Sequence, residues 1–169
     1  AAINRTIDET YGTIVREAQE SMAGGVSLSC MYITWETYQC GNVLSLIVSC
    51  GWGFDMNTHS VYLYDTATGE QMTTAQLLET LQVEPETFLA AVRQAAAERF
   101  DGKYAGIGGD TDELVAERRA WTLSDENINL DVMTYADAAG NLYVYLPIGS
   151  IAGAASYEEP LTLDLGAAG

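Results

Sequence analysis

His59 is the only histidine in the 169-residue chain, so any chemistry that needs an imidazole base depends on it. Its segment, "FDMNTHS", also holds Asp55 and Asn57. A hydrolytic triad would combine His59 with a serine such as Ser49 or Ser60 and an acid such as Asp55. No Gly-x-Ser-x-Gly elbow accompanies these residues. The sequence therefore lacks a complete catalytic constellation, and we expect no catalytic residues.

The same region supplies the candidate binding residues. They are the polar side chains of the segment and the two tyrosines that follow it, namely Asp55, Asn57, His59, Tyr62 and Tyr64. Further tyrosines, at positions 135, 143 and 145, fall in predicted strands. Tyrosines that face solvent together form a stacking platform for a sugar or a peptide, whereas tyrosines in a core pack their rings and leave hydroxyls at the rim. Both interpretations stay open.

Two segments carry calcium-type oxygen ligands. In "DENINLD", residues 125–131, Asp and Asn alternate, but Leu130 occupies the position that needs glycine and Ala136 that of the bidentate glutamate. A strand with one polar face is the simpler interpretation of this alternation. In "GGDTDE", Asp110 and Glu113 have the spacing of a capping box at a helix start. We expect no metal site and no cofactor.

The charge balance is strongly acidic, with 24 acidic against 7 basic residues and a net charge of −17. Such a surface repels phosphate groups, which argues against nucleic acid and anionic membranes as partners. A cationic partner is compatible with this charge, and so is a solvated acidic surface without a partner.

The three cysteines stand at positions 30, 40 and 50, without a CxxC pair. A disulfide between Cys30 and Cys50 on neighbouring strands is one interpretation, with Cys40 free near a turn. Three buried thiols are the other, because free cysteine behaves as a small hydrophobe.

These residues must be positioned by a chain that alternates between helical and strand patterns. The apolar spacing predicts a single domain with an N-terminal helix at 3–22, strands at about 26–66, helices at about 74–120 and strands at about 121–165. We expect a hairpin turn at Gly41-Asn42, a loop at "FDMNTHS", and a helix cap at Thr73 or Thr74. The segregated elements predict the α+β class, an antiparallel sheet with helices packed on one face.

Four segments together resemble a known family. The N-terminal "IN" helix, "VLSLIVS", "VYLYDTATGEQMTTAQLL" and "LDVMTYADAAGNLYVYLPI" are similar to an uncharacterised domain of bacterial cell-envelope proteins. Members form the extracellular part of lysozyme-responsive anti-sigma factors and accompany the catalytic domain of some peptidoglycan deacetylases. The family's compact Gly-Gly-Ala-His motif is not kept in "GWGFDMNTHS", although Asp65, Thr68 and Gly69 match its later portion.

The resemblance implies a non-catalytic extracytoplasmic domain that binds or senses a protein or a cell-wall glycan. The parent chain would be secreted or membrane-anchored, with no membrane contact by this domain. The associated deacetylases bind a metal with an aspartate and two histidines, which a chain with one histidine cannot supply. A hydrolase that uses His59 and a purely structural scaffold are the alternatives.

Overall fold

The N-terminal segment forms one long helical stretch, as its apolar stripe predicts. The computed structural model describes residues 2–24, 32–51, 57–152 and 156–166. The stretch consists of α1 (Ala2–Ile7), a π-helical turn η1 (Asp8–Gly12) and α2 (Thr13–Ala23). Tyr11, within the π-helical turn, is buried against the first sheet. The predicted helix at 3–22 is confirmed.

The first sheet is antiparallel, with strands in chain order. It contains β1 (Tyr32–Cys40), β2 (Val43–Gly51), β3 (Asn57–Asp65) and the short β4 (Glu70–Met72). Gly41, with a φ of 55°, makes the predicted turn between β1 and β2. The expected loop at "FDMNTHS" is wrong for residues 57–60, which belong to β3 and pair in register with residues 48–51. Backbone pairing overrides the weak strand propensity of Asn57 and the polar residues after it.

Alternate residues of this sheet face two different cores, since successive side chains of a strand point to opposite sides. Val43, Ile47 and Leu63 face the large core that the helices and the second sheet share. Leu46, Val48 and Cys50 face the N-terminal helix in a smaller cluster. We call these the inner and the outer face of the first sheet.

Three helices follow: α3 (Thr74–Leu81), α4 (Pro85–Lys103) and α5 (Asp112–Thr122). Thr73 caps α3 in a reciprocal capping box with Gln76, which confirms one of the two expected caps. The expected capping box of Asp110 and Glu113 is wrong. Thr111 precedes α5 with helical backbone angles and makes no side-chain cap; its hydroxyl bonds to the carbonyl of Gly108 instead.

The second sheet contains β5 (Met133–Ala136), β6 (Leu142–Gly149) and β7 (Ser156–Thr162), also antiparallel. The predicted strand is wrong before residue 133, because residues 123–132 form successive turns. The side-chain amide of Asn127 donates to the carbonyl of Trp121, and that of Asn129 to the carbonyls of Asp125 and Glu126. Such local bonds between side chain and backbone compete with strand pairing.

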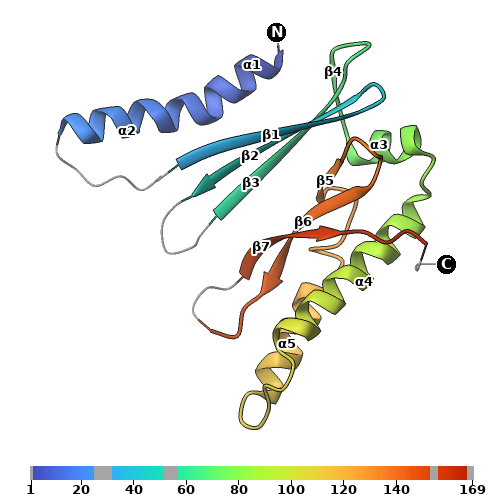
Figure 1. The fold of residues 1–169 in the computed structure, drawn as a ribbon. Helices are drawn as coiled ribbons and strands as arrows, with labels where there is room; N and C mark the ends of the chain where they lie inside the picture. The colour runs from blue at the N-terminus through green and yellow to red at the C-terminus, as the bar shows by residue number, and fades with distance from the viewer. Residues whose placement is uncertain (1, 25–31, 52–56, 153–155, 167–169) are drawn as a thin grey trace.

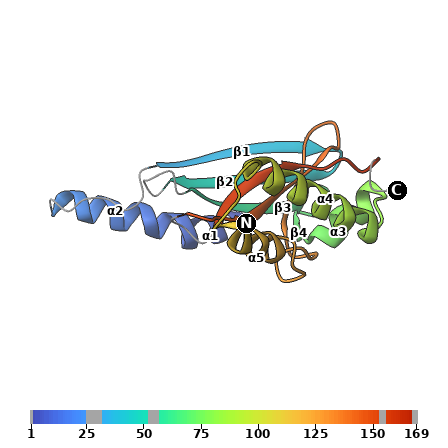
Figure 2. The ribbon, with the colours of Figure 1, turned by 90° about the horizontal axis from the view of Figure 1, so that it is seen from below.

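The elements stack in layers, with the N-terminal helix on the outer face of the first sheet and the second sheet against its inner face (Figure 1). Helices α4 and α5 cover the far side of the second sheet, as the view from below also shows (Figure 2). The α+β class is confirmed. The strands divide into two sheets, and helices lie on both sides of the stack rather than on one face.

The two sheets are joined by a buried serine. The Ser45 hydroxyl of β2 donates to the carbonyl of Ala136 in β5 at 3.2 Å and accepts from the amide of the same residue at 3.3 Å. One side chain thus satisfies both backbone groups of a residue that is fully buried.

Of the helices in the described residues, none is apolar over a length that could cross a bilayer. Cys50 is buried under the N-terminal helix, and Cys40 lies half-buried at the end of β1. Cys30 lies outside the described residues, so a bridge between Cys30 and Cys50 stays a prediction.

Candidate functional site

The candidate binding residues do not form one surface. Asn57 and His59 lie on the inner face of β3, whereas Tyr62 and Tyr64 lie on its outer face. Tyr62 packs against the small cluster under the N-terminal helix, and Tyr64 is buried. Asp55 lies outside the described residues. Of the five candidate residues, Asn57 and His59 therefore lie on the inner face. Residues from other strands lie beside them and form the rest of that surface.

His59 is held from two sides. Its Nδ1 lies 2.9 Å from the hydroxyl of Ser49, which stands directly opposite on β2. Its ring stacks on that of Tyr145 in β6, with centroids 4.1 Å apart and an interplanar angle of 17°. Next to this pair, Asn57 accepts a hydrogen bond from the hydroxyl of Tyr32 at 2.9 Å.

Among the described residues, a carboxylate that contacts His59 belongs to Glu158 of β7. It accepts a hydrogen bond from the backbone N–H of His59 at 2.7 Å, not from the ring. Burial lowers the pKa of His59, and the charge of Glu158 raises it by less, so the net shift is downward. The imidazole is therefore mainly neutral at neutral pH.

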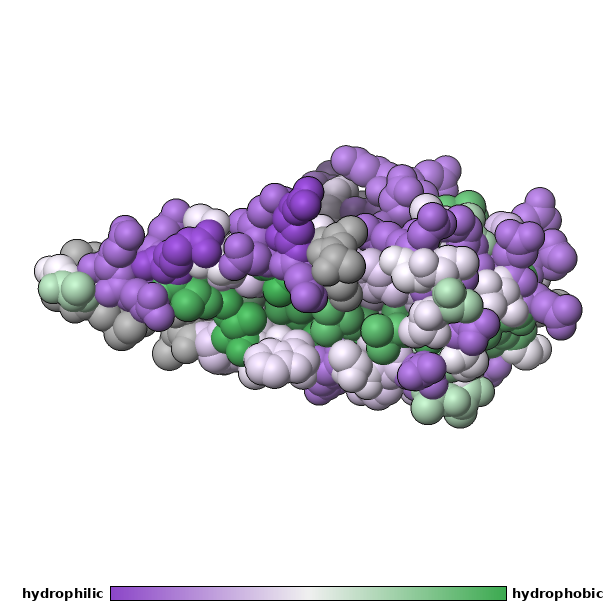
Figure 3. All heavy atoms as spheres, turned by 90° about the horizontal axis from the view of Figure 1, so that it is seen from above, coloured by the Kyte–Doolittle hydropathy of each residue, from purple (hydrophilic) through white to green (hydrophobic). Residues whose placement is uncertain are grey.

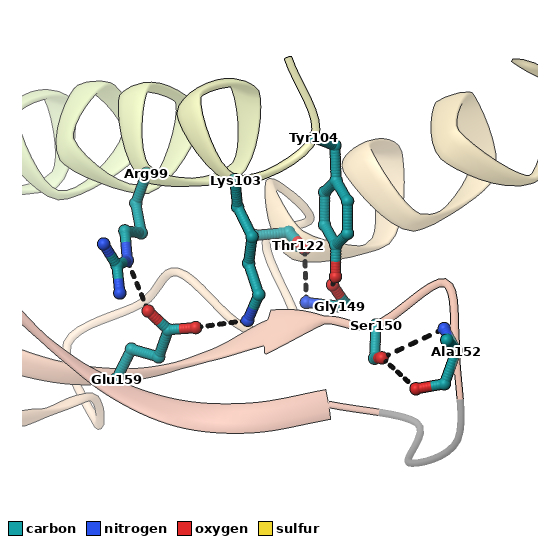
Figure 4. Close-up of polar contacts among 8 residues, drawn as sticks. All are labelled: Arg99, Lys103, Tyr104, Thr122, Gly149, Ser150, Ala152 and Glu159. Carbon is teal, nitrogen blue, oxygen red and sulfur yellow. Dashed lines mark hydrogen bonds and ion pairs between the residues drawn. The ribbon is translucent and has the colours of Figure 1, made fainter. Parts of the chain in front are cut away.

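Glu158 is positioned by its neighbour on the opposite side of β7. Glu159 is buried and forms ion pairs with Arg99 and Lys103 of α4, the latter at 2.5 Å (Figure 4). In the same view, Tyr104 donates to the carbonyl of Gly149 and the hydroxyl of Thr122 accepts from its amide. These contacts fix β7 and the end of β6 to the helices, so Glu158 must face the first sheet.

Stacked tyrosines continue the surface away from His59. The ring of Tyr135 stacks on three others, with centroid distances of 5.0 Å to Tyr143, 5.7 Å to Tyr38 and 5.9 Å to Tyr145. We call these four tyrosines and His59 the aromatic face. Tyr135 and Tyr145 are each only 9% exposed. The area that a ligand can reach therefore comes mostly from Tyr38 and Tyr143, which we call the rim of the aromatic face.

Carboxylates accept hydrogen bonds from the rim hydroxyls. Tyr38 donates to Glu36 at 2.9 Å, and Tyr143 donates to Asp137 at 3.2 Å. The hydrogen bond to Glu36 raises the pKa of Tyr38, and that to Asp137 raises the pKa of Tyr143. With Glu158, the aromatic face is thus bordered by negative charge, which suits a cation or a hydroxyl-bearing ligand. Within the described residues, no three His, Cys, Asp or Glu side chains come together to hold a metal.

No protein-family model matches the chain, and no curated protein matches it either.

Sequence reasoning missed four residues of the site: Glu36, Tyr38, Asp137 and Glu158. Glu158 lies 99 residues after His59 in the chain, and nothing in its segment "YEEPLTL" marks which of its two glutamates faces the first sheet. Tyr38 shares strand parity with Cys40, which would have placed it on the inner face once that face was known.

Proposed function

We propose that this domain is a non-catalytic binding module that recognises a protein or a cell-wall glycan through the aromatic face. The observation that carries the proposal is the way His59 is held. The hydroxyl of Ser49 is hydrogen-bonded to Nδ1 of His59, and the ring of Tyr145 stacks on the imidazole. The carboxylate of Glu158 accepts a hydrogen bond from the backbone N–H of His59. In a hydrolytic triad a carboxylate orients the imidazole and the serine bonds to the other nitrogen. Here the ring is fixed as part of a surface instead.

The chemistry of the surface favours two ligand classes. Aromatic rings bordered by carboxylates attract cationic side chains, and the net charge of −17 would steer a cationic protein toward the domain. The half-buried rings of Tyr38 and Tyr143, with hydroxyls and carboxylates beside them, are also suited to stack on sugars and to hydrogen-bond to sugar hydroxyls. A sensing role in a secreted or envelope-anchored parent protein is supported by the family resemblance of the four segments quoted above.

The test is calorimetric titration with three probes: soluble muropeptides, an N-acetylglucosamine hexamer and hen lysozyme as a cationic protein. We expect binding to at least one probe, and a loss of about tenfold or more in affinity on Tyr143→Ser. Trp35→Ser is the matched control, because it removes an exposed aromatic ring from the other face of the first sheet. Absence of binding to all three, or equal losses in both variants, contradicts the proposal.

A hydrolase is the second candidate, and the Ser49–His59 hydrogen bond favours it. Its test is turnover of muropeptides and of a chromogenic ester by the wild type, Ser49→Ala and His59→Ala. Robust turnover that both variants lose would replace binding by catalysis. Turnover that both variants keep would come from a contaminant.

A further inference from the structure

The outer face of the first sheet is only partly covered by the N-terminal helix. Tyr11 packs with Leu46, Val48 and Cys50 over the middle of the sheet. Trp35, which points outward from the edge strand β1, is 71% exposed, and Val15 on the neighbouring side of the helix is 45% exposed. These are large apolar side chains left in water on one continuous surface.

A groove runs between the helix and β1. It has a volume of about 690 Å³ and is lined by Ile7, Tyr11 and Val15 from the helix, Ile33 and Trp35 from β1, and Leu46 and Val48 from β2, with Asn4, Asp8, Gly12 and Thr37. Figure 3 shows it from above as an apolar stripe with the polar side of the helix along one border. Among the described residues, the groove is thus a long apolar surface beside the N-terminal helix.

The part of the outer face that the N-terminal helix leaves uncovered, over β1, is about as wide as one helix. A helix with its side chains is about 10 Å across and covers about two strands, which lie about 4.8 Å apart. The N-terminal helix covers β2 and β3, since Tyr62 of β3 contacts its cluster. A second helix packed beside it at an interaxial distance of about 8–10 Å would lie over β1 and enclose Trp35.

The net charge of the chain favours a basic partner over a second copy of the chain in this groove. A second copy would bring another −17 to the same place, which opposes self-association through this face. A helix with basic residues beside its apolar stripe would gain from the same field. On the groove itself, the side chain of Asp8 is 72% exposed, and its ion pair with Arg16, among the described residues, is long at 3.5 Å.

We propose that this groove binds an amphipathic helix of a partner protein, with its apolar stripe on Trp35, Ile33 and Val15 and basic residues on its flanks. The groove extends along the helix from Asn4 to Val15, about 17 Å at the helical rise. Contact over that length takes about three turns, so apolar residues at i, i+3, i+4 and i+7 are the recognition pattern. The site lies on the opposite side of the sheet from the aromatic face and does not depend on the function of that face.

The probe is a synthetic peptide of about 14 residues built from leucine at the apolar positions and lysine elsewhere. Binding to the full chain is followed by fluorescence anisotropy of the labelled peptide and by its circular dichroism. We expect helix formation on binding and a loss of about tenfold or more in affinity with Trp35→Ser. Tyr143→Ser, on the aromatic face, serves as the matched control and should bind like the wild type.

Two further peptides separate charge from shape. A version with glutamate in place of lysine should bind at least about tenfold more weakly, and a scrambled version without the apolar stripe should not bind. The proposal is overturned if the peptide does not bind or if Trp35→Ser binds it unchanged. It is also overturned if the peptide binds without gaining helix, which would indicate strand addition to β1. A wild-type dimer that Trp35→Ser dissociates in sedimentation would make a second copy the occupant and equally overturn it.

Discussion

His59 belongs to a packed surface in this structure, and burial lowers the pKa of its imidazole. Its ring lies between the hydroxyl of Ser49 and the face of Tyr145, where protonation would bury a charge. Glu158 offsets part of that penalty. The protonation state of one side chain therefore reports on the contact between the two sheets.

The pH dependence of His59 follows from its lowered pKa. Between the lowered value and the ordinary value of 6.5, the unfolded chain binds more protons than the folded chain. The free energy of unfolding should therefore fall as the pH drops below 6.5 and through the pKa of the folded state. The measurement is urea unfolding between about pH 8 and pH 5, compared with His59→Gln, whose curve should fall less over this range.

Proton NMR of the sole imidazole gives the pKa directly. Glu158→Gln should lower it further, because the charge of Glu158 raises it. A value at or above 6.5 in the wild type would contradict the burial of the ring against Tyr145.

At the scale of elements, β7 connects the helices to the first sheet through the two faces of one strand. Glu159 faces α4 and Glu158 faces β3, one residue apart. The strand can hold Glu158 against His59 because Arg99 and Lys103 hold the other face. Two adjacent glutamates thus have different roles, and substitution should separate them.

Glu159→Gln should lower the free energy of unfolding by about 2 kcal/mol near neutral pH, since charge-assisted hydrogen bonds to a buried carboxylate are lost. Arg99 is 56% exposed and Lys103 30%, which keeps the effect below that of a fully buried pair. Burial raises the pKa of Glu159, but the contacts with Lys103 and Arg99 outweigh it, so the net shift is downward.

The difference in free energy of unfolding between the wild type and Glu159→Gln should therefore be fully present at pH values above the ordinary glutamate pKa of 4.5. It should disappear as the pH falls through the lowered pKa of Glu159 in the folded state. Glu158→Gln is the control on the same strand and should lose much less stability near neutral pH. Equal losses for the two substitutions in urea titration would show that the contacts with α4 do not fix the strand.

The sequence predicts elements best where one local signal dominates. The sequence of α4 has proline, Pro85, in its first turn and apolar residues such as Phe88, Val92 and Phe100 at helical spacing, so its own residues predict that helix, and Thr73 predicts the start of α3. Residues 125–131 fail because alternation fits both a strand and a series of Asn-stabilised turns, and side-chain bonds to the backbone decide between them. For the site, Ser49 and His59 are near in sequence, whereas Tyr145 and Glu158 arrive only through the packing of the second sheet on the first.

At the scale of the whole molecule, the two cores are unequal. The large cluster joins both sheets and the helices α3 and α4, and residues such as Phe88 and Leu146 in it are fully buried. Among the side chains of the N-terminal helix whose burial is described, Tyr11 alone is a buried member of the small cluster, with Ile7 and Ile14 partly buried beside it. Regions with few buried apolar contacts open locally before the rest of a protein unfolds.

We therefore expect amide hydrogen exchange in residues 2–23 to proceed through local opening, while α4 and β6 exchange only through global unfolding. Tyr11→Ala should reduce protection in the N-terminal helix and leave α4 almost unchanged, because the large core does not include Tyr11. Phe88→Ala should reduce protection in α4 and β6 together by about 3–5 kcal/mol. If Tyr11→Ala lowered protection in α4 as much as in its own helix, the two cores would unfold as one unit. A helix that opens separately would also make the groove beside it adjustable, since its wall could shift to fit a partner without disturbing the aromatic face.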